Sequence, residues 1–169
     1  MVFMNEFVEQ ALQQEEDTQK DRFLIFVLAK ETFGIEIKFV SEIIGVQPIT
    51  KVPKAPFFAK GIINLRGKIV PIIDMRLKFG KEPIEYDDRT CIIIVNILGM
   101  LAGLIVDCVE EVITIAEEKI VPPPDFKSGF QNRYINRIGM IDNEVKLLLD
   151  CDRLLKDDEF EEINQLQNF

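Results

Sequence analysis

Three pairs of adjacent acidic residues are the side chains of this sequence that could most readily do chemistry. They are Asp87-Asp88, Glu110-Glu111 and Glu117-Glu118. Two carboxylates act as a general acid and base, or bind a hard cation, only when their oxygen atoms converge on one point. Neighbouring residues of a strand point to opposite faces. The pairs therefore favour solvated side chains, and a carboxylate-based enzyme stays an alternative that needs two acids converging in a cleft.

The residue types of most other enzyme and metal sites are missing or scattered. The chain has no histidine, which removes histidine-based acid–base catalysis, histidine-activated nucleophiles and histidine-ligated metals. Cys91, Cys108 and Cys151 are widely spaced, and the first two have apolar neighbours, which favours buried reduced thiols. No glycine-rich phosphate-binding motif occurs. These absences predict a protein that is not an enzyme and binds no cofactor or metal.

The overall charge narrows the classes of partner. The chain has 169 residues, with 29 acidic and 20 basic side chains and a net charge of −9. Such a chain repels phosphate backbones and anionic membranes, which argues against nucleic-acid binding. No apolar run approaches the ~18 residues of a membrane span, and the N-terminus lacks the basic segment of a secretory signal peptide. A cytoplasmic protein without membrane insertion is the simplest interpretation.

A predicted hairpin over Gly61–Met75 is the element best able to present a functional side chain. β-branched residues dominate both of its strands, and Gly67-Lys68 suits a turn with positive φ at its first central position. Pro71 has no N–H to donate, so the second strand is expected to lie at an edge or to have an unbonded position there. Arg66 then stands at the tip of a stiff hairpin, either as a solvated turn residue or as a contact for a partner.

Further strands are expected on both sides of this hairpin. Phe23–Leu28 and Thr32–Ile37 have strand composition, whereas Phe39–Ile44 followed by Gly45 fits one helical turn with a glycine cap. A last hairpin is expected over Ile138–Leu149. Residues 1–20 are expected to form a flexible or partly helical extension, and residues 156–169 a helical or frayed tail.

The second half of the chain repeats the first. A shift of 69 residues, from Gly34 to Gly103, lays residues 23–44 on residues 92–113 without a gap. The other identical pairs are Ile25/Ile94, Val40/Val109, Glu42/Glu111 and Ile44/Ile113. The later strand Val145–Asp150 also resembles Ile69–Asp74. The pattern predicts two copies of one small β unit.

The sequence therefore predicts an all-β protein of about ten short strands. We expect two small five-stranded β-barrels on a shared core, with lobes at roughly 21–80 and 90–150 and a short C-terminal helix, because units of this size bury little surface alone. A ligand-binding β-barrel sensor is a second functional alternative, which would need a dry, sizeable cavity between the lobes.

One hairpin motif also resembles a known family. Asn64-Leu65-Arg66-Gly67, followed by an apolar strand that ends in Asp74 and Arg76, is similar to the hairpin of CheW-like chemotaxis coupling proteins. The resemblance covers roughly Phe23 to Leu155 and delimits a domain at about 21–155. It implies two SH3-like barrels and a non-catalytic adaptor between the cytoplasmic tips of chemoreceptors and the regulatory domain of the histidine kinase CheA. It also implies recruitment from the cytoplasm to receptor arrays at the inner membrane.

The resemblance carries expectations for single residues. It implies receptor contacts at Arg66, Asn64, Gly103, Val109 and Val112. It implies kinase contacts at Val40, Glu42, Gly61 and Phe126, although Glu42 fits either partner and the valines also suit an ordinary core. Val121 occupies a position where some members carry arginine, so the polar part of the contact near Phe126 differs here.

Overall fold

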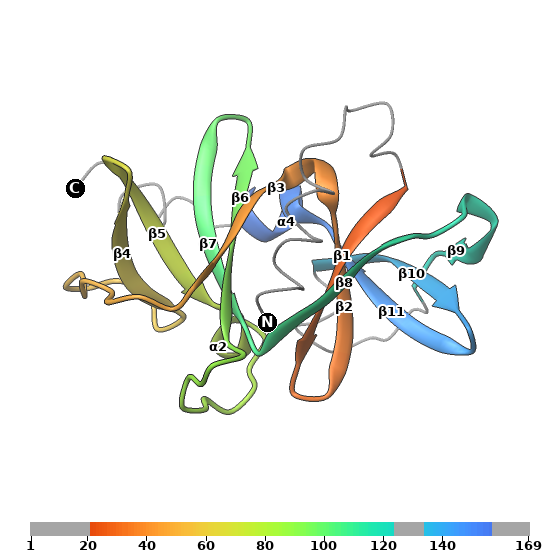
Figure 1. Cartoon of the computed structure of the whole chain (residues 1–169), viewed down its shortest axis with the longest axis horizontal. Coiled ribbons are helices and arrows are strands. Elements are labelled where there is room, and N and C mark those ends of the chain that lie inside the picture. Colours follow the sequence, from red (N-terminus) through yellow and green to blue (C-terminus); the bar gives the residue numbers. More distant parts are fainter. Residues whose placement is uncertain (1–20, 124–133, 157–169) are drawn as a thin grey trace.

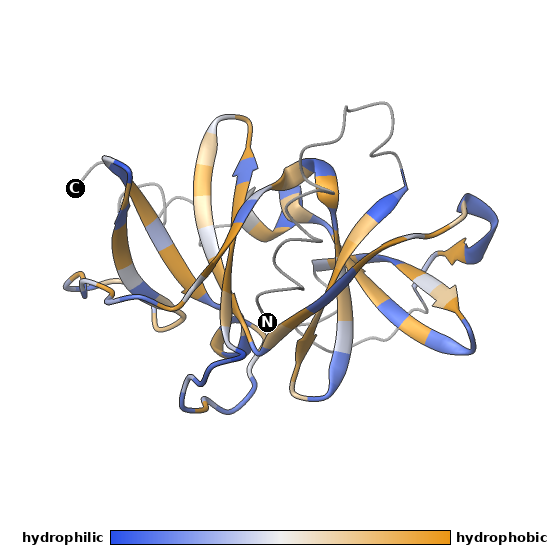
Figure 2. Cartoon of the chain, viewed as in Figure 1, coloured by the Kyte–Doolittle hydropathy of each residue, from blue (hydrophilic) through white to orange (hydrophobic). Residues whose placement is uncertain are grey.

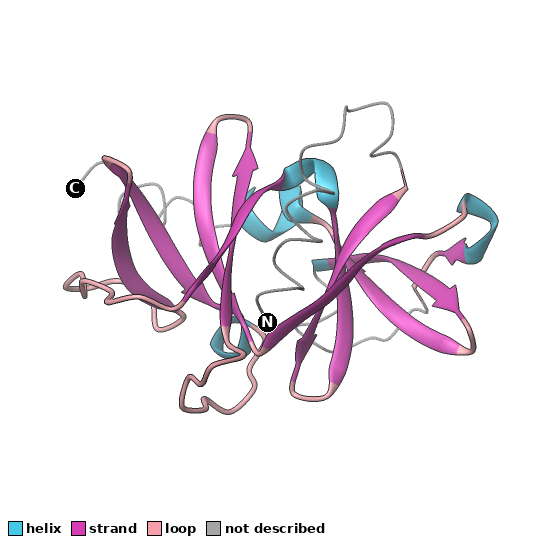
Figure 3. Ribbon diagram, viewed as in Figure 1, coloured by secondary structure: helices cyan, strands magenta, loops and turns pink. Residues whose placement is uncertain are grey.

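The computed structural model describes residues 21–123 and 134–156, and over these ranges the protein is all-β (Figure 1). Figure 3 shows the strands separated by a few short helices. The strands are β1 (Arg22–Leu28), β2 (Glu31–Glu36), β3 (Val40–Gly45), β4 (Ala59–Leu65), β5 (Lys68–Asp74), β6 (Cys91–Ile97), β7 (Met100–Val106), β8 (Cys108–Thr114), β9 (Ile120–Val121), β10 (Ile135–Ile141) and β11 (Glu144–Leu149). The helices are the 3-10 turns η2 (Ile37–Phe39) and η3 (Glu117–Lys119) and the α-helices α2 (Met75–Lys78) and α4 (Cys151–Lys156). The predicted class, all-β with a short C-terminal helix, is confirmed.

The strands pair in two sheets. The first has the order β8-β1-β2-β11-β10-β9, and the second has the order β3-β6-β7-β5-β4. The first sheet has six strands where five were expected, because the two-residue β9 adds to β10 at its edge. The expected N-terminal extension, Phe126 and the tail beyond residue 156 lie outside the described residues.

The internal repeat is present in the strands themselves. The shift of 69 residues places β1 on β6, β2 on β7 and β3 on β8. A shift of 76 residues, from Asp74 to Asp150, places β4 on β10, β5 on β11 and α2 on the start of α4. Each sheet combines the first two strands of one copy with the later strands of the other copy: β8 to β11 in the first sheet and β3 to β5 in the second.

This crossed arrangement differs from the lobes expected at 21–80 and 90–150. Strands β3, β4 and β5 belong to the same sheet as β6 and β7, while β1 and β2 pair with strands from the second half. The joining pairs β2–β11 and β5–β7 are parallel. Parallel neighbours need a long connection, so proximity in the sequence does not identify them.

The buried side chains form three clusters. The largest lies between the sheets and includes Phe33, Phe58 and Tyr134. A second cluster lies within the second sheet and includes Ile72 and Ile94, and the third lies within the first sheet and includes Phe23 and Leu148. In Figure 2 the hydrophobic colours follow the strands and the hydrophilic colours gather at turns and connectors.

One pairing next to β4 closes the second sheet on itself. Thr50, in the segment after β3, exchanges both backbone hydrogen bonds with Ile62 of β4, at 2.9 Å each. The backbone N–H and C=O of Ile62 therefore point toward Thr50 and not toward β5. Pro71, which lies opposite Ile62 in β5, is not required to donate a hydrogen bond to it. Strand β5 is an interior strand, paired with β4 and, from Ile72 onward, with β7. Of the two options predicted for Pro71, the unbonded position is the one observed.

The segment expected to form a helical turn is a strand. Residues 37–39 form η2, but Val40–Gly45 is β3, which pairs along β6. Ile43 and Ile44 face Ile93 and Ile92 in this pairing. β-branched side chains fit the surface of a sheet better than a single isolated helical turn, and the partner strand decides between the two.

Candidate functional site

The β4–β5 hairpin presents Arg66 on a two-residue turn. Leu65 pairs with Lys68, so the central residues are Arg66 and Gly67, with φ of 50° and 85°. The positive φ predicted for Gly67 is confirmed, but the turn begins one residue earlier than expected. Two positive φ values give the tight hairpin turn that matches strand twist. Asn64 Oδ1 accepts a hydrogen bond from the Gly67 amide at 2.8 Å, which fixes the turn.

The side chain of Arg66 forms an ion pair with Glu42 of β3. Arg66 Nη1 donates to Glu42 Oε1 at 3.2 Å, and Nη2 donates to Oε2, so the pair is bidentate. The hydrogen bonds to Glu42 and its negative charge raise the pKa of Arg66. The arginine side chain is 71% exposed and the glutamate 26% exposed. The contact joins strands at opposite ends of the second sheet, so residues assigned to two different partners lie side by side.

The other predicted kinase contacts lie on the same closed sheet but are covered. Val40 is buried at the start of β3. Gly61 is buried in β4 with φ of 144°, and a Cβ built there would lie 2.0 Å from the Thr50 carbonyl oxygen. This glycine is required by the close approach of two backbones. Any direct contact of Gly61 with a partner would be made through its backbone.

The second-half residues predicted to contact a receptor are buried in the structure. Val109 and Val112 of β8 belong to the core between the sheets. A Cβ on Gly103 would lie 2.5 Å from Ile72 Cδ1, so a side chain at this position would displace isoleucines of the core. Its repeat partner Gly34 is similarly crowded by Leu148 Cδ2, at 2.8 Å. Val121, on β9, is half-exposed, whereas Phe126 lies outside the described residues.

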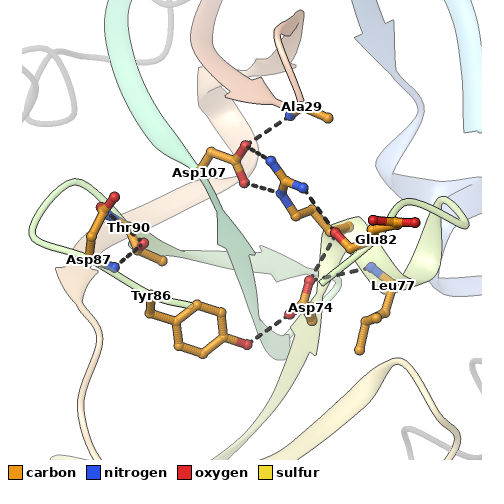
Figure 4. A network of polar contacts seen from close by, with 9 residues as sticks. Ala29, Asp74, Leu77, Glu82, Tyr86, Asp87, Thr90 and Asp107 are labelled. Atoms are coloured by element: carbon orange, nitrogen blue, oxygen red, sulfur yellow. Dashed lines mark hydrogen bonds and ion pairs between the residues drawn. The ribbon is translucent and has the colours of Figure 1, made fainter. Parts of the chain in front are cut away.

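A polar network joins the two sheets at a point that the sequence did not identify (Figure 4). Asp107, between β7 and β8, accepts hydrogen bonds from Arg76 Nε and Nη2, each at 2.7 Å, and from the Ala29 amide at 2.8 Å. Arg76 Nη1 also donates to the Glu82 carbonyl oxygen at 2.9 Å. Burial acts to raise the pKa of Asp107, but the hydrogen bonds from Arg76 and Ala29 outweigh it and lower that pKa. We call Arg76 and Asp107 the inter-sheet ion pair.

A second branch of the network fixes the connector between the copies. Asp74 caps α2 by accepting from the Arg76 and Leu77 amides, and its other oxygen accepts from the Tyr86 hydroxyl at 2.8 Å. Burial, followed by this hydrogen bond, raises the pKa of Tyr86. The sequence showed Asp74 and Arg76 as part of a motif, but their partners are distant in the chain and carry no local signal.

The described residues contain no arrangement typical of catalysis. No group of three or more acidic or cysteine side chains within 21–123 and 134–156 could hold a metal ion. Cys91, Cys108 and Cys151 are free and buried, as expected for the first two, and burial raises the pKa of each thiol.

Two open hollows of about 490 and 510 Å³ are lined mostly by charged residues. Neither has the dry, apolar lining that a ligand-binding sensor needs.

Within the described part of the chain, no helix has the length and apolar character needed to cross a membrane.

These features define a class of β protein: a duplicated chain forms two sheets that each take strands from both copies, and an exposed hairpin presents an arginine at the surface. Residues 22–159 match the model of the CheW-like domain, and the chain belongs to this family. It is 38% identical over 143 residues to the chemotaxis protein CheW of Klebsiella aerogenes, covering 85% of this chain and 86% of that protein. It is 34% identical to the probable chemotaxis protein CheW of Rhizobium etli, covering 85% and 93%. The crystal structure of the scaffolding protein TtCheW from Thermoanaerobacter tengcongensis superposes with a TM-score of 0.76 at 39% identity, covering 82% of this chain and 94% of that one.

Proposed function

We propose that this protein is a non-catalytic chemotaxis adaptor that couples the cytoplasmic tips of chemoreceptors to the regulatory domain of the histidine kinase CheA. The proposal places the protein in the cytoplasm, recruited to receptor arrays at the inner membrane. Membership of the CheW-like family supports this assignment. So do relatives named as chemotaxis proteins and a solved relative named as a scaffolding protein.

The observation that carries the proposal is the exposed Arg66–Glu42 pair on a rigid hairpin. The turn fixes the Arg66 backbone, and Glu42 already restrains the guanidinium. A partner carboxylate or helix-terminal carbonyl can therefore bind its remaining donors with little further loss of freedom. Because Glu42 also belongs to the expected kinase patch, receptor binding at Arg66 and kinase binding at Glu42 act on adjoining surfaces.

The test compares two partners on one variant. Arg66→Asp reverses the charge at the proposed receptor contact and leaves Glu42 beside a second acid, so receptor-tip affinity should fall by roughly 2–5 kcal/mol. Binding to the CheA regulatory domain should change much less. Titration calorimetry against each partner measures both affinities, and thermal unfolding checks the fold.

Lys68→Asp is the matched control, because it reverses a charge two residues away that makes no ion pair within the described chain. Unchanged receptor affinity in Arg66→Asp, or an equal loss toward both partners, would reject Arg66 as the receptor contact.

A further inference from the structure

The charges of this acidic protein are segregated along the chain. The stretch from Ile43 to Ile73 contains five bases and none of the 29 acids. The bases are Lys51, Lys54, Lys60, Arg66 and Lys68. The net charge predicted repulsion of phosphate backbones and anionic membranes, but this stretch forms the end of β3, the loop after it, β4 and most of β5. One end of the second sheet is therefore basic on an otherwise acidic molecule.

The lysines just before β4 and at its start make no ion pair with any residue that the structure describes. Lys51 and Lys54 are exposed and form no ion pair with any residue that the structure describes. Lys60 lies over the Tyr86 ring at 5.9 Å, again without an acid partner. Elsewhere in the described chain, lysines such as Lys81 pair with acids. Unpaired lysines keep their charge available for a partner.

The same loop exposes an aromatic side chain on a fixed backbone. Phe57 is 73% exposed, and its ring meets Phe58 edge-on, with centroids 5.5 Å apart and planes at 84°. Phe58 is buried in the core, and its carbonyl accepts from the Asp74 amide at 2.8 Å. At the other end of the loop, Thr50 is hydrogen-bonded to β4. An exposed aromatic ring held on a fixed backbone can enter a pocket with little loss of conformational entropy.

We propose that residues 46–60, the loop before β4 with the first two residues of that strand, form a docking surface for an acidic segment of another protein. We call these residues the basic loop. Phe57 packs against apolar side chains of that segment, and Lys51, Lys54 and Lys60 pair with its carboxylates. This surface uses none of the residues assigned to the adaptor site, so it does not depend on the proposed function.

An acidic protein segment fits better than an anionic membrane. A membrane is an extended negative surface, and it would meet the acids of the remaining chain as well as the basic loop. Exposed charges separated by more than about 8–10 Å are largely screened at physiological salt. A short acidic segment contacts the loop alone and avoids that repulsion. One aromatic side chain also supplies less apolar surface than the face of a membrane-binding helix.

The probe for this proposal is a fluorescein-labelled synthetic peptide of two heptads rich in glutamate and leucine, titrated with the full-length protein by fluorescence anisotropy. The wild type should bind it, and binding should weaken as salt is raised. Phe57→Ala should weaken binding at least about tenfold, because it removes the aromatic anchor. The double variant Lys51→Glu and Lys54→Glu should weaken it by a similar factor.

Two matched controls separate the loop from general effects. Leu98→Ala removes an apolar side chain that is 85% exposed on the β6–β7 turn, and Lys119→Glu reverses an exposed lysine in η3. Both should bind the peptide like the wild type. Equal losses in the controls, or none in the loop variants, would overturn the proposal.

Two other occupants give distinct results. Binding of the wild type to phosphatidylglycerol vesicles, without binding to the peptide, would show that the loop meets lipid. Peptide binding that occurs only after removal of the acidic residues 157–169 would show that the chain's own residues occupy the loop. Either result overturns docking of a separate protein. Arg66→Asp should retain peptide binding, so failure here is distinguishable from failure of the adaptor proposal.

Discussion

At the scale of single residues, Gly61 shows how a required glycine differs from a binding residue. A methyl group there would overlap the Thr50 carbonyl, at a φ that also favours glycine. Gly67, in the nearby turn, has a positive φ but open space around its Cα. A substitution at Gly61 therefore introduces both steric overlap and backbone strain, whereas a substitution at Gly67 introduces backbone strain alone.

Gly61→Ala should destabilise the protein by at least about 3 kcal/mol, since two backbone segments must separate to admit the Cβ. Gly67→Ala should cost only about 1 kcal/mol, the strain of a positive φ. Chemical denaturation of the two variants measures the difference. Equal, small losses would mean that the Thr50 segment can move away freely. Substitution of Gly61 is thus a poor probe of kinase binding, because it changes the fold first.

The candidate site was only partly predictable from these residues. Arg66 stood out because a glycine follows it within a strong hairpin pattern. Its partner Glu42 lies 24 positions earlier in the chain, and no local pattern links the two. Glycine occurs where a binding partner approaches the backbone closely, and also where another part of the same chain does. The sequence could not show which of these two causes applies at Gly61 and Gly103.

At the scale of elements, the two asparagine-capped turns are natural controls for each other. Asn64 caps Gly67 in the β4–β5 turn, and Asn96 caps Gly99 in the β6–β7 turn at 3.0 Å. Only the first turn carries the Arg66–Glu42 pair. Both exposed hydrogen bonds stabilise a turn, but only one of them orders the proposed receptor contact.

Asn64→Ala should therefore lower stability by about 0.5–1.5 kcal/mol, the net value of one hydrogen bond, and should also weaken receptor-tip binding. Asn96→Ala should show a similar loss of stability and unchanged receptor binding. Thermal unfolding and calorimetry on both variants provide the comparison. Equal receptor affinity in the two would indicate that the turn does not need its cap to hold Arg66.

The positions of the strands in the sequence were more predictable than the pairing of one strand with another. β-branched composition and the 69-residue repeat located most strands, because these signals are local or act at a fixed spacing. Strand β3 was missed, since a short, partly apolar segment that ends in a glycine suits a helix end as well as a strand. The crossed sheets could not be predicted, because alternation shows which face is buried and not which strand lies beside it.

At the scale of the whole molecule, the inter-sheet ion pair holds the two sheets in one arrangement. Arg76 follows a strand of the second sheet, whereas Ala29 lies in the β1–β2 turn of the first. Asp107 binds both, and the side chains of the pair are only 15% and 17% exposed. A largely buried ion pair of this kind is costly to break from one side.

Asp107→Asn should destabilise the protein by about 3 kcal/mol, because it leaves the Arg76 charge without its partner. The pKa of Asp107 is lowered in the folded state, so its contribution is complete above the ordinary aspartate pKa of about 4. The contribution is lost as the pH falls through the lower folded pKa. Denaturation at several pH values should therefore show a smaller acid-induced loss in Asp107→Asn than in the wild type. Parallel pH profiles would contradict the assignment.

The crossed sheets also bear on how such a chain could have arisen. A protein with one copy of the repeat would have lacked strands for either sheet, since each sheet takes its strands from both copies. Two such chains would have exchanged strands in a symmetric, domain-swapped dimer. Fusion of their genes through a segment equivalent to residues 81–90 would have turned that dimer into one polypeptide. The equivalent turns of the two copies now differ: one carries Arg66 and the other carries Asp142, both with φ of 50°.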